Sequence, residues 1–129
     1  MPHVEIEVHI MEGKLREHEY RLLDIIWENE PISSKELVRL ANERFEWKPT
    51  TTYTVIKTLS NAGYAENVNS VVRSLVPREQ VQKNDSSEIV SKRFGGSLPK
   101  FVATFISNDS MSREDAEEIK AMLDKYINE

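Results

Sequence analysis

The strongest constraint on the fold is the stretch from Pro49 to Gly63, which is bounded by residues that start and stop helices. Proline suits the first helical position, and glycine suits the left-handed residue that ends a helix. Between these limits, the residues at helical spacing on one face are Thr52, Val55, Ile56 and Leu59. The pattern predicts one amphipathic helix, with Lys48 at its cap position.

Two further helices and a hairpin are expected around this helix. Apolar residues recur at helical spacing in 14–29, and Glu30-Pro31 ends that segment. Ser33 with Glu36 three residues later has the form of a capping box, which predicts a second helix start. Residues 64–67 and 71–76 resemble two short strands joined by a turn at 68–70. Three helices followed by a hairpin is the order of a winged helix.

The last part of the chain is expected to form helices that need a partner. Ser97 and Ser112 are each placed to cap a short helix with an apolar stripe. Two helices of this size bury too little surface alone, so we expect the same segment of a second chain to cover them. The side chains expected at this homodimer contact are Leu98, Phe101, Val102, Phe105, Ile119, Met122, Leu123 and Tyr126.

These elements predict a mainly α, α+β winged-helix fold, with a three-helix core, a β-hairpin wing and a C-terminal helical dimerisation segment. The expected divisions are an N-terminal extension at 1–12, the winged-helix domain at 13–77 and the dimerisation region at 78–129. In the extension, Val4, Ile6, Val8 and Ile10 alternate with polar residues, which is typical of an edge strand. A frayed arm is the other interpretation.

The composition excludes several classes of function. The chain has no cysteine, so thiol catalysis, disulfides and thiolate metal sites are ruled out. His3, His9 and His18 lack metal-ligand spacing, and no catalytic motif is present, so we expect no enzyme, no cofactor and no metal. No apolar run is long enough for a membrane span, and the N-terminus lacks signal-peptide character. A cytoplasmic protein without membrane contact is expected.

The outer face of the helix that begins at Pro49 suggests contact with nucleic acid. Its short polar and basic side chains suit the major groove, where hydroxyls, methyls and lysines can meet base edges and phosphates. No acidic residue lies between Trp47 and Ala65, although the net charge of the chain is −5. A solvated helix face would have the same pattern. The candidate DNA-binding residues are Lys48, Thr50, Thr51, Tyr53, Thr54, Lys57, Thr58 and, in the hairpin, Arg73.

Several motifs together resemble the penicillinase-repressor family of BlaI/MecI/CopY-type winged-helix transcriptional regulators. The resemblance rests on Trp47-x-Pro49-x-Thr51, on Thr54-Val55-Ile56 with Leu59 and Gly63, and on Glu19-Tyr20 to Ile26-Trp27. In the C-terminal part it rests on Phe94-Gly95-Gly96-Ser97, on Phe101 to Phe105 and on Met111-Ser112. It covers roughly residues 17–126.

The resemblance implies a homodimeric repressor on a pseudo-palindromic operator, with the third helix in the major groove and the C-terminal helices interlocked. The family usually has lysine at the position of Thr50 and arginine at that of Thr58, so weaker phosphate contacts are expected here. Antibiotic-responsive members are cut by a sensor protease pathway at an Asn-Phe bond, and the matching bond is Thr104–Phe105. The cysteine cluster of the copper-responsive members is absent. The alternative function is a winged-helix protein–protein interaction module without strong DNA binding.

Overall fold

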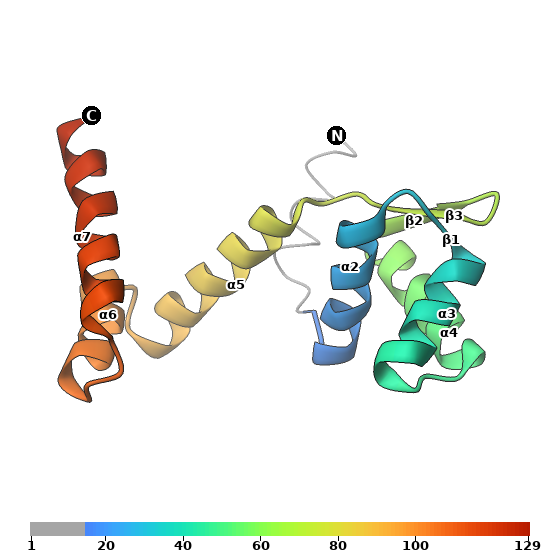
Figure 1. The fold of residues 1–129 in the computed structure, drawn as a ribbon, viewed down its shortest axis with the longest axis horizontal. Coiled ribbons are helices and arrows are strands. Elements are labelled where there is room, and N and C mark those ends of the chain that lie inside the picture. Colours follow the sequence, from blue (N-terminus) through green and yellow to red (C-terminus); the bar gives the residue numbers. More distant parts are fainter. Residues whose placement is uncertain (1–14) are drawn as a thin grey trace. The chain divides into compact units, whose positions relative to one another are not determined.

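The computed structural model describes residues 15–129, which form two compact units, residues 15–84 and Asp85–Glu129 (Figure 1). The first unit contains three helices, α2 (Glu17–Asn29), α3 (Ser34–Phe45) and α4 (Pro49–Asn61). It also contains the three short strands β1 (Ile32–Ser33), β2 (Ala65–Val68) and β3 (Val71–Ser74). These elements confirm the predicted α+β winged-helix fold.

The helix starts follow the capping residues in the sequence. The Ser33 hydroxyl accepts a hydrogen bond of 3.1 Å from the backbone N–H of Glu36, at the first turn of α3. At the first turn of α2, the Glu19 carboxylate accepts one of 2.8 Å from the backbone N–H of Arg16. Lys48 is the N-cap of α4 and gives no side-chain cap bond, so Pro49 at the first helical position defines this start.

The sheet is antiparallel with the strand order β1-β3-β2, so β3 lies in the middle. Asn69 and Ser70 form the two-residue turn between β2 and β3. Both have positive φ, as the central residues of a type I′ hairpin turn require. The carbonyl oxygen of Ser70 accepts a hydrogen bond of 2.9 Å from the backbone N–H of Ser34. This bond fixes the hairpin turn to the start of α3.

One hydrophobic core holds the first unit together. It joins the inner faces of α2, α3 and α4 to the sheet and to Val76 and Val81. Its fully buried side chains include Leu22, Leu23, Ile25, Ile26, Leu37, Leu59 and Val72. Because α4 contributes Val55, Ile56 and Leu59 to this core, its opposite face is held outward.

The residues that follow β3 pack against side chains of α2. The indole N–H of Trp27 donates a hydrogen bond of 2.9 Å to the carbonyl oxygen of Val76. The Arg78 guanidinium lies over the Trp27 ring and 3.2 Å from the Asp24 carboxylate. These contacts secure the first turn of α5 (Arg78–Arg93), in which Val81 is the one buried residue.

The second unit contains the rest of α5, followed by α6 (Leu98–Ser107) and α7 (Arg113–Asn128). Gly95 and Gly96 both have positive φ, which glycine adopts without a steric cost, and they separate α5 from α6. The Ser97 and Ser112 hydroxyls cap α6 and α7, as predicted, at 3.2 and 3.0 Å from the N–H groups of Lys100 and Asp115.

The structure differs from the sequence-based expectation in one strand and in several bounds. The two-residue strand β1 was not predicted, and the hairpin strands were predicted at 64–67 and 71–76 rather than at 65–68 and 71–74. The alternating segment Val4 to Ile10 lies outside the described residues. The functional divisions at residues 12 and 77 stay predictions.

Candidate nucleic-acid interface

Helix α4 has two faces of opposite character. Its inner face is buried and consists of Thr52, Val55, Ile56 and Leu59. Its outer face is exposed and contains every candidate that the sequence analysis assigned to this helix: Thr50, Thr51, Tyr53, Thr54, Lys57 and Thr58. Lys48 is also exposed, directly before the first turn. The fold therefore brings these candidates together on one solvent-facing strip.

The hydroxyl groups on this strip are not equivalent. The Thr54 hydroxyl donates a hydrogen bond of 2.9 Å to the carbonyl oxygen of Thr50, and the Thr58 hydroxyl donates one of 3.0 Å to that of Thr54. Within residues 15–129, the hydroxyls of Thr50 and Thr51 form no hydrogen bond. The first turn therefore keeps hydroxyl donors, whereas the middle of the helix presents hydroxyl acceptors and methyl groups.

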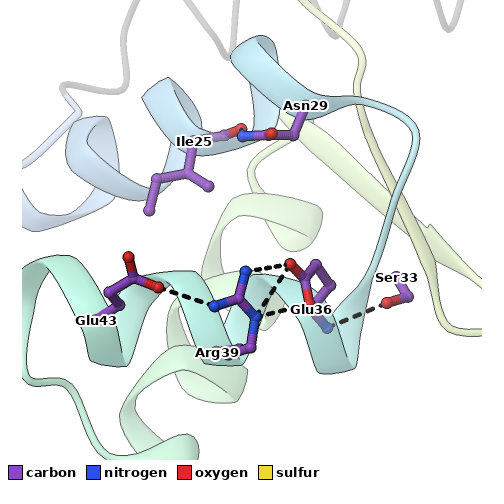
Figure 2. Close-up of polar contacts among 6 residues, drawn as sticks. All are labelled: Ile25, Asn29, Ser33, Glu36, Arg39 and Glu43. Carbon is purple, nitrogen blue, oxygen red and sulfur yellow. Dashed lines mark hydrogen bonds and ion pairs between the residues drawn. The ribbon is translucent and has the colours of Figure 1, made fainter.

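Ion pairing decides which cations of the first unit are available to a polyanion. Arg39 is fully engaged: its guanidinium lies 2.6 Å from the Glu36 carboxylate and 2.8 Å from that of Glu43 (Figure 2). Its hydrogen bond to Glu36 holds the pKa of that carboxyl below its usual value and raises the pKa of the guanidinium. Arg44 is likewise paired with Glu28, at 3.1 Å.

The cations on and beside α4, unlike Arg39 and Arg44, are not held by carboxylates of the described residues. Lys48 and Lys57 are exposed, and neither forms an ion pair with any residue that the structure describes. No carboxylate belongs to α4. An anion approaching this strip meets two free ammonium groups and the N–H groups of the first helical turn, which favour negative charge.

The hairpin adds one further candidate cation. Arg73 is exposed on β3, and it too forms no ion pair within the described part of the chain. Its partner across the antiparallel ladder is Glu66 on β2, which is half-buried. The carboxylate at this register position reduces the positive potential around Arg73, so we expect the wing to contribute less than α4 to binding an anion.

The second unit exposes an apolar surface on helices that bury no residue. Leu98, Phe105, Ile119, Met122, Leu123 and Tyr126 are all exposed, the last at 78%. Phe101 and Val102 are half-buried. The rings of Phe94, Phe101 and Phe105 stack edge to face, with centroids 5.3 and 5.2 Å apart. All eight predicted dimer-contact residues are thus at least partly available to a partner.

Sequence reasoning missed two members of this apolar surface and one property of α4. Ile106 and Ile127 are exposed at 62% and 74%, although they lay outside the predicted stripes. The inward bonding of Thr54 and Thr58 was also not foreseen. The spacing of Thr50, Thr54 and Thr58, four residues apart, is the signal that could have indicated it.

Neither a membrane-spanning helix nor a group of metal-binding side chains occurs in residues 15–129. None of the helices there combines the length and apolar character needed to cross a bilayer. In the same residues, no three His, Asp or Glu side chains are grouped so as to hold a metal ion.

Comparison with known proteins gives a family match over most of the chain. Residues 15–125 match the family described as penicillinase repressor. The chain is 25% identical over 120 residues to the penicillinase repressor of Bacillus licheniformis, covering 89% of this chain and 93% of that protein. It is 23% identical over 111 residues to the methicillin resistance regulatory protein MecI of Mammaliicoccus sciuri and of Staphylococcus aureus, covering 83% of this chain and 90% of each.

Proposed function

Because the chain belongs to the penicillinase-repressor family, we propose that it is a dimeric transcriptional repressor that reads a short pseudo-palindromic operator in double-stranded DNA. In this proposal α4 enters the major groove, and the protein acts in the cytoplasm without a cofactor or an enzymatic activity. The observation that carries the proposal is the strip on α4, where every candidate side chain is exposed and no carboxylate is present.

The chemistry of the strip supports DNA as the partner. Lys48, Lys57 and the N-terminal turn of α4 can meet phosphates, and the threonines in the middle of the helix are short enough to approach base edges. Arg73 on the wing supplies a further phosphate or minor-groove contact. Since few cations are free on and beside α4, we expect the affinity to be modest. Because each phosphate contact releases counterions, we expect the affinity to fall with salt by an amount set by the number of those contacts.

The apolar surface of α6 and α7 supports the dimer. Large aliphatic and aromatic side chains on two helices that bury nothing are unusual for an isolated protomer. A second copy that covers Leu98, Met122 and Leu123 would remove them from water and place two α4 helices on one duplex. The half-sites of the operator would then be related by the two-fold axis of the dimer.

We propose the Thr104–Phe105 bond as the point where an upstream sensor protease would relieve repression. This bond lies within α6, and the Thr104 hydroxyl donates a hydrogen bond of 2.7 Å to the carbonyl oxygen of Phe101. Cutting requires local opening of that helix turn, because its backbone groups are bonded within the helix. Mass spectrometry of the chain after induction in cells should find a fragment that begins at Phe105.

The test begins by enriching, from a random pool, the DNA duplex that the intact chain binds best, which we call the selected duplex. Binding of the chain and its variants to the selected duplex is then measured. Thr54→Ala and Lys57→Ala should each weaken binding in fluorescence anisotropy at low salt. Their matched controls are Thr104→Ala, which removes a similarly bonded threonine hydroxyl on α6, and Lys83→Ala, which removes an exposed lysine on α5. Both controls should bind as the unaltered chain does.

Two outcomes would count against the proposal. If Thr54→Ala and Lys57→Ala bound as tightly as the controls, α4 would not be the reading element. If the intact chain enriched no duplex at low salt, the alternative of a protein–protein interaction module would be favoured. The acidic net charge of −5 is the observation on the side of that alternative.

A further inference from the structure

The inward hydrogen bonds of Thr54 and Thr58 restrict what these side chains can offer to a ligand. A hydroxyl group has one proton to donate and two lone pairs that accept. Both protons are already used, at 2.9 and 3.0 Å from backbone carbonyl oxygens one turn earlier in α4. Because both side chains are exposed, an approaching partner meets an acceptor oxygen and a methyl group.

The edges of the four bases in the major groove differ in how they match such a surface. Adenine and cytosine present an amino group that donates, and thymine presents a methyl group. Guanine presents two acceptors, N7 and O6, and a phosphate oxygen also only accepts. An acceptor oxygen beside a methyl group therefore complements adenine, cytosine or thymine, but not guanine and not phosphate.

We propose that Thr54 and Thr58 are specificity-determining residues that select adenine, cytosine or thymine over guanine at the bases they face. This inference rests on the proposed function, since it requires α4 to lie in the major groove. The two residues are four apart, which is about 6 Å along the helix axis. With base steps of about 3.4 Å, they face positions roughly two steps apart in each half-site.

The hydrogen-bond donors of the outer face of α4 are side chains other than Thr54 and Thr58. Lys57 and Lys48 carry ammonium groups, which donate only, and the Thr50 and Thr51 hydroxyls form no hydrogen bond within residues 15–129. On the outer face of α4, the side chains that can donate to phosphates and guanine edges are these groups and the Tyr53 hydroxyl, beside the backbone N–H groups of the first turn. To donate to guanine, Thr54 or Thr58 must first give up its bond to the helix, which lowers affinity about fivefold.

The experiment uses the selected duplex and versions of it altered one atom group at a time. Removing the amino group of an adenine or cytosine that faces either threonine, or the thymine methyl by substituting deoxyuridine, should weaken binding of the unaltered chain about fivefold. Thr54→Val and Thr58→Val keep the methyl groups but lack the acceptor, so they should no longer respond to loss of an amino group. Thr54→Ser and Thr58→Ser keep the acceptor, so they should no longer distinguish thymine from deoxyuridine.

Thr104→Val is the matched control, since its hydroxyl is also exposed and bonded to a carbonyl oxygen of its own helix, at 2.7 Å. It should respond to every altered duplex as the unaltered chain does. The inference is overturned if the valine and serine variants keep the full pattern of responses. It is also overturned if the facing bases are guanines whose contribution is lost in the valine variants. The two outcomes above overturn this inference and leave the proposed function standing. If the intact chain enriches no duplex at all, the proposed function fails together with this inference.

Discussion

Replacing Lys57 by alanine should make DNA binding less sensitive to salt, by an amount that follows from the number of free cations. Lys57 is exposed on α4 and forms no ion pair within the described residues, so its removal leaves the core and the helix caps untouched. What it removes is one ammonium group that can neutralise a phosphate. Because the proposed repressor is a dimer, each substitution removes two such groups from the complex.

The magnitude follows from counterion release. Among the described residues, α4 with its cap position and the hairpin carry three free cations, Lys48, Lys57 and Arg73, so a dimer that binds through these groups alone neutralises about six phosphates. The slope of log K against log salt concentration should then be about −5 for the unaltered chain. Binding should weaken by about a thousandfold between 50 and 200 mM salt. Lys57→Ala should make the slope less steep by about two, because two phosphate contacts are lost.

The assay is fluorescence anisotropy with the selected duplex at four or more salt concentrations. Arg39→Ala serves as the control, because the Arg39 guanidinium is held by Glu36 and Glu43 and is unavailable to DNA. Its slope should equal that of the unaltered chain. A slope for Lys57→Ala that matches the unaltered chain would refute the assignment of Lys57 to a phosphate. A slope change in Arg39→Ala would refute the argument that ion pairing decides which cations bind.

Three further predictions concern stability and assembly. Thr52→Val should stabilise the chain against urea by about 1 kcal/mol, because the Thr52 hydroxyl oxygen is buried with no hydrogen-bond partner in the described structure; a loss of stability would mean that this oxygen has a partner. Trp27→Phe should lower the free energy of unfolding by about 1–2 kcal/mol in the same assay, since the Val76 carbonyl loses its indole donor. An unchanged unfolding midpoint would contradict this. Leu123→Asp should convert dimers to monomers in sedimentation velocity while the helical circular dichroism spectrum is kept, and a persistent dimer would exclude α7 from the interface.

Local signals in the sequence were sufficient to locate the starts of α3, α4, α6 and α7. Pro49 and Gly63 delimit α4, and Ser33, Ser97 and Ser112 each act as the predicted cap. A cap or a proline acts within one turn of the chain, so its effect can be recognised from neighbouring residues alone. The outward position of the α4 candidates followed from the same period, because the inner face was fixed by its apolar residues.

The features that sequence reasoning missed depend on partners far along the chain or on side-chain rotamers. Strand β1 exists because Ile32 pairs with Val72, forty residues later, and two residues give no recognisable pattern of their own. The bonds of the Thr54 and Thr58 hydroxyls depend on a rotamer choice, and threonine in a helix has two that are populated. Ile106 and Ile127 were missed because a stripe drawn from the period alone is narrower than the apolar surface that the helices present.

Whether the outer face of α4 reads DNA can be measured by mapping the backbone amide chemical shifts of the intact chain with and without the selected duplex. The largest changes should fall in residues 48–58, with smaller changes at the wing around Arg73. Lys57→Ala should reduce the changes on α4 at equal duplex concentration. Changes confined to α6 and α7, with α4 unaffected, would contradict the reading of DNA by α4.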